Sequence, residues 1–130
     1  GRFYAYTNVQ MPKVSTSDWP NVVLELLGRL AKEFSPLKKI NSVLPNRYRT
    51  GRDCIPPHAD DENSSADHPT IFSISLGATR TFSNYPFHLR ATLFRLRLES
   101  GSLLIMEGSM QQLYKHSVDV ESTCWDPTLI

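Results

Sequence analysis

Apolar residues recur at helical spacing in one stretch near the start of the chain. The repeating apolar positions are Val23, Leu26, Leu27, Leu30 and Phe34. Steps of three and four residues predict one amphipathic helix, with Pro20 in its first turn and Ser17 or Asp18 as its cap. The pair Ser35 and Pro36 ends the pattern. We expect the apolar stripe to pack against a sheet as support, without chemistry of its own.

After this helix, short runs of β-branched, aromatic and other apolar residues alternate with Gly, Pro, Asn and Ser. The expected strands are residues 42–48, 71–76, 79–82, 92–98, 102–106 and 116–120. Alternation of apolar residues with Arg95 and Arg97 indicates a half-exposed strand, whereas the continuous run 103–106 suits burial on both faces. The pattern predicts a mainly β, jelly-roll fold with one N-terminal helix.

Size and charge limit the possible partners. The 130 residues fit one domain, so we expect a single domain over residues 1–130. With 14 basic and 13 acidic residues, the chain is not held to nucleic acid by bulk electrostatics. Any contact with a polyanion would therefore be local. The candidate clusters are Arg47, Arg49 and Arg52, and Arg95 with Arg97, although a solvated strand face explains either one equally well.

The two cysteines, Cys54 and Cys124, form no CxxC motif and no disulfide framework. This pattern favours a reducing compartment, and we expect an intracellular protein of the nucleus or cytoplasm. No apolar run is long enough for a membrane span, and no signal peptide is recognisable. We expect a monomer.

A split triplet carries the candidate chemistry: His58-Ala59-Asp60, and His116 much later in the chain. In an extended segment, the period of two points His58 and Asp60 to the same face. With His116 they make two imidazoles and one carboxylate, the ligand set of non-haem Fe(II) oxygenases. A structural zinc site would need a fourth ligand, usually cysteine. His-x-Asp also occurs by chance, and His116 could be a satisfied interior histidine.

Neighbouring segments add to the triplet. They are residues 46–53 (Asn-Arg-Tyr-Arg-Thr-Gly-Arg-Asp), 58–62, 73–82 and 101–108. In this order they closely resemble the AlkB family of Fe(II)/2-oxoglutarate dioxygenases, most of all its animal nucleic-acid repair homologues. The resemblance runs from about Tyr4 to Pro127. It implies a double-stranded β-helix with the iron near one open end.

The resemblance also assigns roles to residues. It implies that Fe(II) is bound by His58, Asp60 and His116, and that 2-oxoglutarate is contacted by Asn46 and Tyr48. It further implies that a methylated base is stacked by Tyr4 and Tyr6 and faced by Asp61 and Glu62. Apart from the resemblance, Tyr48 would be a core aromatic, and Asp61 and Glu62 would be part of a solvated loop. Mn, Ni or Zn can occupy such a site in place of iron.

The sequence departs from the family at its C-terminal end. There the family carries a Pro-Arg-x-Asn-Leu-Thr-Phe-Arg-like strand whose two arginines bind the co-substrate, but Thr128 follows Pro127 here. A threonine hydroxyl is a much weaker anchor for a carboxylate than a bidentate arginine. Arg80, Arg90 and Lys115 could reach the pocket, although their spacing does not indicate it. We expect a domain truncated at both ends.

The resemblance implies oxidative demethylation of N-alkylated bases in DNA or RNA: an N-methyl group is hydroxylated and leaves as formaldehyde. Two alternatives stay open. Thr128 favours a catalytically impaired pseudoenzyme or a nucleic-acid-binding module. The triad itself would equally serve a dioxygenase of proteins or small molecules.

Overall fold

The computed structural model describes residues 4–6, 9–11, 15–34, 40, 42–60, 70–89 and 91–122. Two compact units make up the chain, Gly1–Asn46 and Arg47–Ile130. Within the described residues, no helix has both the length and the apolar character needed to cross a bilayer. The single-domain prediction stays a prediction.

The first unit contains the predicted helix. Helix α1 spans Asn21–Glu33 and is stabilised on its surface by an ion pair between Arg29 and Glu25, 2.6 Å apart. Two short strands that periodicity did not reveal, β1 (Tyr4–Tyr6) and β2 (Val9–Met11), pair antiparallel. Three residues are too few for a detectable alternation.

The predicted cap of this helix is wrong. Pro20 stands at the N-cap, where no side chain makes a capping hydrogen bond. Ser17 and Asp18 instead belong to a 3-10 turn, Thr16–Asp18. There the Ser17 hydroxyl donates to Ser15 Oγ at 2.8 Å. These polar groups are satisfied locally, which removes them from the helix end.

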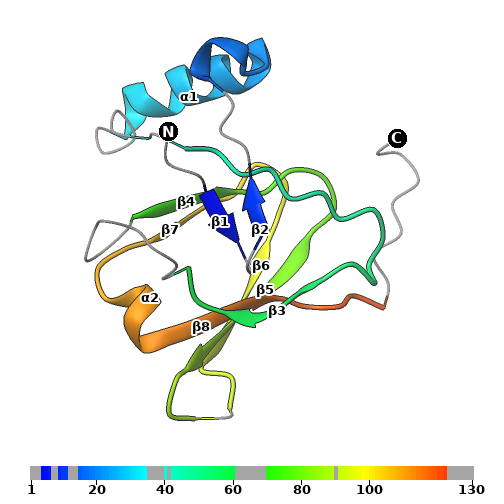
Figure 1. The fold of residues 1–130 in the computed structure, drawn as a ribbon. Coiled ribbons are helices and arrows are strands. Elements are labelled where there is room, and N and C mark those ends of the chain that lie inside the picture. Colours follow the sequence, from blue (N-terminus) through cyan, green and yellow to red (C-terminus); the bar gives the residue numbers. More distant parts are fainter. Residues whose placement is uncertain are drawn as a thin grey trace. The chain divides into compact units, whose positions relative to one another are not determined.

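The second unit is built from two antiparallel sheets. The larger one has the order β3-β8-β5-β6, with bounds β3 Ile55–His58, β8 Tyr114–Val118, β5 Arg80–Pro86 and β6 Phe94–Leu98. The smaller one pairs β4 (Ile71–Ile74) with β7 (Leu103–Met106). A short helix, α2 (Met110–Leu113), leads from β7 into β8 (Figure 1).

Side chains from both sheets of this unit form its core. Phe82 from β5, Leu98 from β6 and Met106 from β7 are buried, with 3%, 8% and 4% of their surface exposed. Partly buried side chains of β4, β7 and α2 pack against them: Ile71, Leu104 and Met110. The two sheets therefore enclose one apolar layer, which confirms the predicted mainly β, jelly-roll architecture.

One predicted strand is absent, and the predicted burial of another strand was wrong. Residues 42–48 form no strand in the structure. Pro45 interrupts this segment, and a proline cannot donate to a β-ladder. β7 was expected to be buried on both faces, yet Ile105 is 40% exposed. Only one face of the β4–β7 pair contacts the core, so a continuous apolar run did not mean two covered faces.

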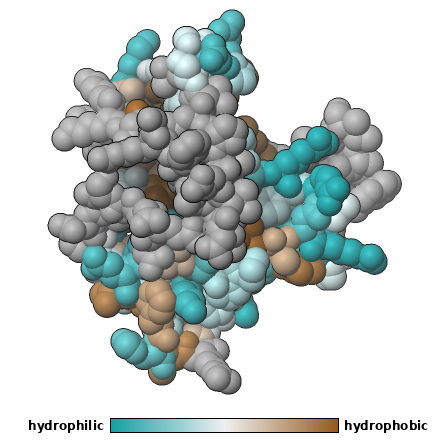
Figure 2. All heavy atoms as spheres, viewed as in Figure 1, coloured by the Kyte–Doolittle hydropathy of each residue, from teal (hydrophilic) through white to brown (hydrophobic). Residues whose placement is uncertain are grey.

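The strand expected at residues 92–98 is present as β6, but it is more exposed than predicted, since four of its five residues are exposed. Leu98 is its buried residue, whereas Phe94 and Leu96 are 39% and 38% exposed. At the nearby turn and at the end of α2, further apolar side chains are exposed: Phe87, Leu89, Leu93 and Leu113. Figure 2 shows brown, hydrophobic residues among hydrophilic ones at the foot of this face. The part of the described surface that is visible there carries both hydrophobic and hydrophilic residues and is not uniformly charged.

Candidate metal centre

An irregularity in strand β3 positions the first histidine. Ile55 pairs with Val118 and His58 pairs with His116, so β3 advances three residues where β8 advances two. The extra residue falls at Pro56 and Pro57, which lack amide hydrogens and are tolerated because β3 is an edge strand. This bulge places His58 directly opposite His116.

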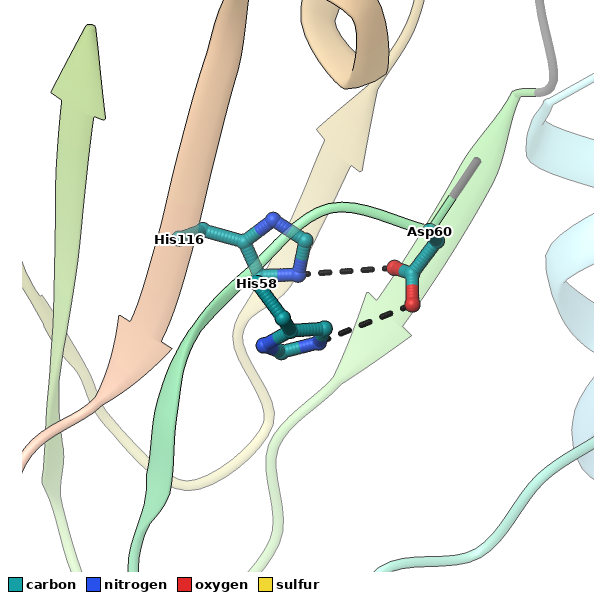
Figure 3. A group of neighbouring side chains, drawn as sticks. All are labelled: His58, Asp60 and His116. Atoms are coloured by element: carbon teal, nitrogen blue, oxygen red, sulfur yellow. Dashed lines mark ion pairs between the residues drawn. The ribbon is translucent and has the colours of Figure 1, made fainter. Parts of the chain in front are cut away.

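The three predicted metal ligands lie together. The Nε2 atom of His58 is 3.6 Å from Asp60 Oδ1, and the Nε2 atom of His116 is 3.4 Å from Asp60 Oδ2. One possible ligand atom from each residue lies within 4.8 Å of the others. Figure 3 shows both rings turned toward the carboxylate, which comes from the loop after β3.

This arrangement fits a divalent metal ion. Ligand atoms held about 2.1 Å from one ion at right angles are about 3 Å apart, so the observed spacing needs only a small contraction. Two imidazoles and one carboxylate are the donor set that suits Fe(II) while leaving further positions open. The side chain of His116 is 8% exposed, but those of His58 and Asp60 are 25% and 23% exposed. One side of the triad is thus accessible to small molecules.

Contacts around the histidines fix their orientation. The Nδ1 atom of His58 is 2.9 Å from the carbonyl oxygen of Pro56. Because a carbonyl only accepts, Nδ1 carries a hydrogen, and Nε2, which faces Asp60, is the nitrogen that would bind a metal ion once its own proton is lost. The ring of Phe82 stacks on His116 with centroids 5.4 Å apart and planes inclined by 19°. The bulge and the stacked ring together preorganise both imidazoles.

Electrostatic coupling within the triad favours the charged carboxylate. Burial acts to raise the pKa of Asp60, but hydrogen bonds from His116 and His58 outweigh it and hold that pKa well below its usual range. The hydrogen bond that His58 donates to Asp60 raises the pKa of His58, against the opposing effect of burial. Asp60 is therefore an anionic ligand at neutral pH, and a bound cation would take the place of the proton on His58.

A residue that sequence reasoning missed holds the ligand loop. Gln111 of α2 is 2% exposed, and its Oε1 atom accepts the amide hydrogen of Asp60 at 2.9 Å. Its Nε2 atom contacts the sulfur of Met106 at 3.7 Å. Gly108, with φ 61°, makes the turn from β7 into this helix, a conformation that L side chains rarely adopt. No periodicity or motif marks Gln111, because its role depends on the fold alone.

Replacing Gln111 by leucine should weaken Fe(II) binding about tenfold or more, since groups that orient metal ligands typically contribute factors of 10 to 100. The variant leaves the Asp60 amide without its acceptor while keeping the side-chain volume. Anaerobic calorimetry with Fe(II) measures the effect. Leu113→Gln, a change on the exposed end of the same helix, is the matched control and should bind iron as the wild type does. Equal affinities for Gln111→Leu and wild type would show that the bridge has no influence on the metal.

Tyr48, one of the two predicted co-substrate residues, lies in the same unit as the triad. It is half-buried, and the guanidinium carbon of Arg80 lies 5.0 Å from the centre of its ring. Arg80 donates to the carbonyl oxygens of Thr50 at 3.0 Å, Asp119 at 2.8 Å, and Asp53. Its guanidinium is thus engaged with backbone around Tyr48, so the suggestion that Arg80 serves the co-substrate directly is not supported.

The described structure does not test the roles predicted for the remaining residues. Asn46 is the last residue of the first unit, and Tyr4 and Tyr6 are the two ends of β1. The side chain of Lys115 is exposed, with Nζ 5.4 Å from the centre of the Phe87 ring. Four further positions lie outside the described residues: Asp61, Glu62, Arg90 and Thr128. Their assigned roles stay predictions.

Sequence comparisons agree with this geometry. Residues 1–128 match the sequence profile of the 2OG-Fe(II) oxygenase superfamily. Alpha-ketoglutarate-dependent dioxygenase alkB homolog 3 of Mus musculus is 34% identical over 129 residues, which are 91% of this chain and 43% of the mouse protein. The Homo sapiens homolog 3 is 33% identical, over 95% of this chain and 45% of its own length.

A second group of relatives is similar over a shorter stretch. DNA oxidative demethylase ALKBH2 of Homo sapiens is 37% identical over 118 residues, which are 83% of this chain and 45% of the human protein. The chain thus spans less than half the length of these curated relatives. The profile match covers nearly all of its residues, and the predicted ligand triad is present in space. The chain belongs to the 2OG-Fe(II) oxygenase superfamily, and its similarity there is to AlkB-family dioxygenases.

Proposed function

We propose that this protein is an Fe(II)- and 2-oxoglutarate-dependent dioxygenase that removes methyl groups from N-alkylated bases of DNA or RNA. The observation that carries the proposal is the convergence of His58, Asp60 and His116 within 4.8 Å in a chain of this superfamily. Motif order alone gave the same residues, and the bulge in β3 gives a physical reason for their meeting.

In the proposed reaction, 2-oxoglutarate and dioxygen are converted to succinate and carbon dioxide. One oxygen atom enters succinate and the other hydroxylates the N-methyl carbon. The hydroxymethyl group then leaves as formaldehyde: the electrons of the broken C–N bond stay on the ring nitrogen of the cationic base, and the hydroxyl proton is released to solvent. What bound Fe(II) supplies is the activation of dioxygen; orientation and ligation come from the protein.

The protein groups have separate tasks in this proposal. His58 and His116 bind through neutral Nε2 atoms, and Asp60 supplies one negative charge, so the ferrous site keeps a single net positive charge. The phenol of Tyr48 donates to a carboxylate of 2-oxoglutarate, as does the amide of Asn46. The stacking aromatics and acidic residues for a cationic methylated base are Tyr4, Tyr6, Asp61 and Glu62.

A nucleic-acid substrate is supported by the names of the relatives, one of which is a DNA oxidative demethylase. The charge distribution supports local contact only. Arg49 binds Asp53 with 3.4 Å between Nε and Oδ2, and Arg97 binds Glu121 at 3.0 Å. These pairs are partly neutralised within the chain, so Arg47 and Arg52, both exposed, are the better candidates for a phosphate contact.

Product formation tests the proposal. The protein is loaded with Fe(II) under argon and then given oxygen, 2-oxoglutarate and an oligonucleotide carrying 1-methyladenine or 3-methylcytosine. We expect succinate and formaldehyde in equal amounts, with a large decrease when the same oligonucleotide is unmethylated. DNA and RNA versions of one sequence distinguish the two substrates. Absence of both products from iron-loaded protein, with either nucleic acid, would refute the proposal.

Thr128 favours a second candidate function: a pseudoenzyme that binds metal or nucleic acid without turnover. Its discriminating property is failure to bind the co-substrate. Calorimetry with 2-oxoglutarate and its unreactive analogue N-oxalylglycine separates the two candidates. Binding of both compounds to metal-loaded protein would exclude the pseudoenzyme, and restored affinity in Thr128→Arg alone would favour it.

A further inference from the structure

Asn84 lies beside the metal centre, although no motif singled it out. It is on β5 directly opposite His116 of β8 in the antiparallel register. Opposite residues of such a pair share one face of the sheet, with Cβ atoms about 4.5–5.5 Å apart. Phe82, two residues earlier on the same strand, stacks on the His116 ring. The side chain of Asn84 is therefore on the face that carries the triad.

The amide of Asn84 is buried without a partner. None of its surface is exposed, and neither Oδ1 nor Nδ2 makes a hydrogen bond among the described residues. A buried amide with no partner lowers stability, whereas an apolar side chain of the same size would not. Phe82 on the same face shows that apolar residues are compatible with this surface. Polar atoms that are unsatisfied next to a metal site point to a ligand that completes them.

We propose that Asn84 is a co-substrate-binding residue whose Nδ2 group donates to an oxygen of the 2-oxo acid bound at the metal. This inference rests on the proposed function. The dianionic co-substrate offers only acceptor oxygens, so it can accept a hydrogen bond from Nδ2 but cannot donate one to Oδ1. We expect a water molecule to donate to Oδ1 instead.

The depth of Asn84 argues for the co-substrate and against the methylated base. A base reaches the triad from its accessible side, where His58 and Asp60 are about a quarter exposed. Asn84 lies beside His116, the most buried of the three ligands. The residue also supplies a donor in a chain where Thr128 stands in place of an arginine. A neutral amide is a weaker donor to a carboxylate than an arginine guanidinium, so we expect a modest affinity for the 2-oxo acid.

Three variants test this inference with a readout independent of turnover. Wild type, Asn84→Leu, Asn84→Asp and the control Tyr85→Phe are loaded anaerobically with Mn(II) and titrated with 2-oxoglutarate and N-oxalylglycine by calorimetry. Tyr85 is the next residue of β5 and turns to the other face, where its hydroxyl contacts Ser117 Oγ at 3.2 Å. Affinity should decrease about tenfold in Asn84→Leu. It should decrease further in Asn84→Asp, which opposes a carboxylate to a dianion, and stay unchanged in Tyr85→Phe.

Thermal unfolding of the metal-free proteins provides the second measurement. Asn84→Leu should melt at a higher temperature than wild type, because it removes the unsatisfied amide, and its Mn(II) affinity should be unchanged. Wild-type protein that binds neither compound would count against the proposed function itself. Wild-type binding with an Asn84→Leu affinity within twofold would overturn this inference alone. So would an Asn84→Leu protein that loses affinity for the methylated oligonucleotide but not for the 2-oxo acid.

Discussion

Asp60→Ala should bind Fe(II) more than about 100-fold more weakly than wild type, because even the groups that only orient metal ligands contribute 10- to 100-fold. The substitution removes the only carboxylate of the group and leaves two imidazoles, one of them on the edge strand β3. A neutral pair of histidines lacks the charge that compensates a divalent cation in a partly buried site. Metal analysis after anaerobic loading and desalting should give close to one iron per wild-type chain and almost none for the variant.

A matched substitution separates this effect from a general loss of acidic charge. Glu107 carries an exposed carboxylate just after β7 and is not part of the metal-binding group. Glu107→Ala should therefore retain iron at the wild-type level. Wild-type iron content in Asp60→Ala would contradict the assignment of the triad.

The second large effect concerns stability. Arg80→Met should lower the free energy of unfolding by about 3 kcal/mol, because several buried hydrogen bonds lose their charged donor at once and each is worth about 1–3 kcal/mol. Arg80 is 8% exposed and links the loop before β3 to the end of β8 through the carbonyl oxygens of Thr50, Asp53 and Asp119. Methionine keeps much of the length of the side chain but offers no donor. Urea unfolding followed by circular dichroism measures the change.

Arg97→Met is the control for this prediction. Arg97 lies on the adjacent strand β6 and donates to Thr81 Oγ1 at 2.7 Å and to Glu121 at 3.0 Å, but its side chain is 56% exposed. An exposed pair of this kind contributes about 1 kcal/mol or less. If both variants lost the same small amount of stability, Arg80 would not be the buried link that the structure describes.

The main architecture was predictable because its signals are local. Helix α1 follows from a 3.6-residue repeat, and the strands near His116 follow from short apolar runs. The ligands themselves came from a resemblance over several motifs, since His-x-Asp alone is not specific. Residue type and order were enough for these features.

The features that shape the site were not predictable, since they depend on which strands become neighbours. The bulge at Pro56 and Pro57 appears only when β3 is paired with β8. The bridge from Gln111 to Asp60 joins residues 51 positions apart in the sequence. The burial of Asn84 follows from the central position of β5 in the sheet. An amide in a sequence looks the same whether it is solvated or enclosed beside a metal.

The most direct test of the central claim is a crystal structure of the protein grown anaerobically with Fe(II), with an anomalous difference map measured at the iron absorption edge. We expect one strong peak, about 2.1 Å from the Nε2 atoms of His58 and His116 and from a carboxylate oxygen of Asp60. A map without a peak between these three side chains, or with its strongest peak at other residues, would contradict the central claim.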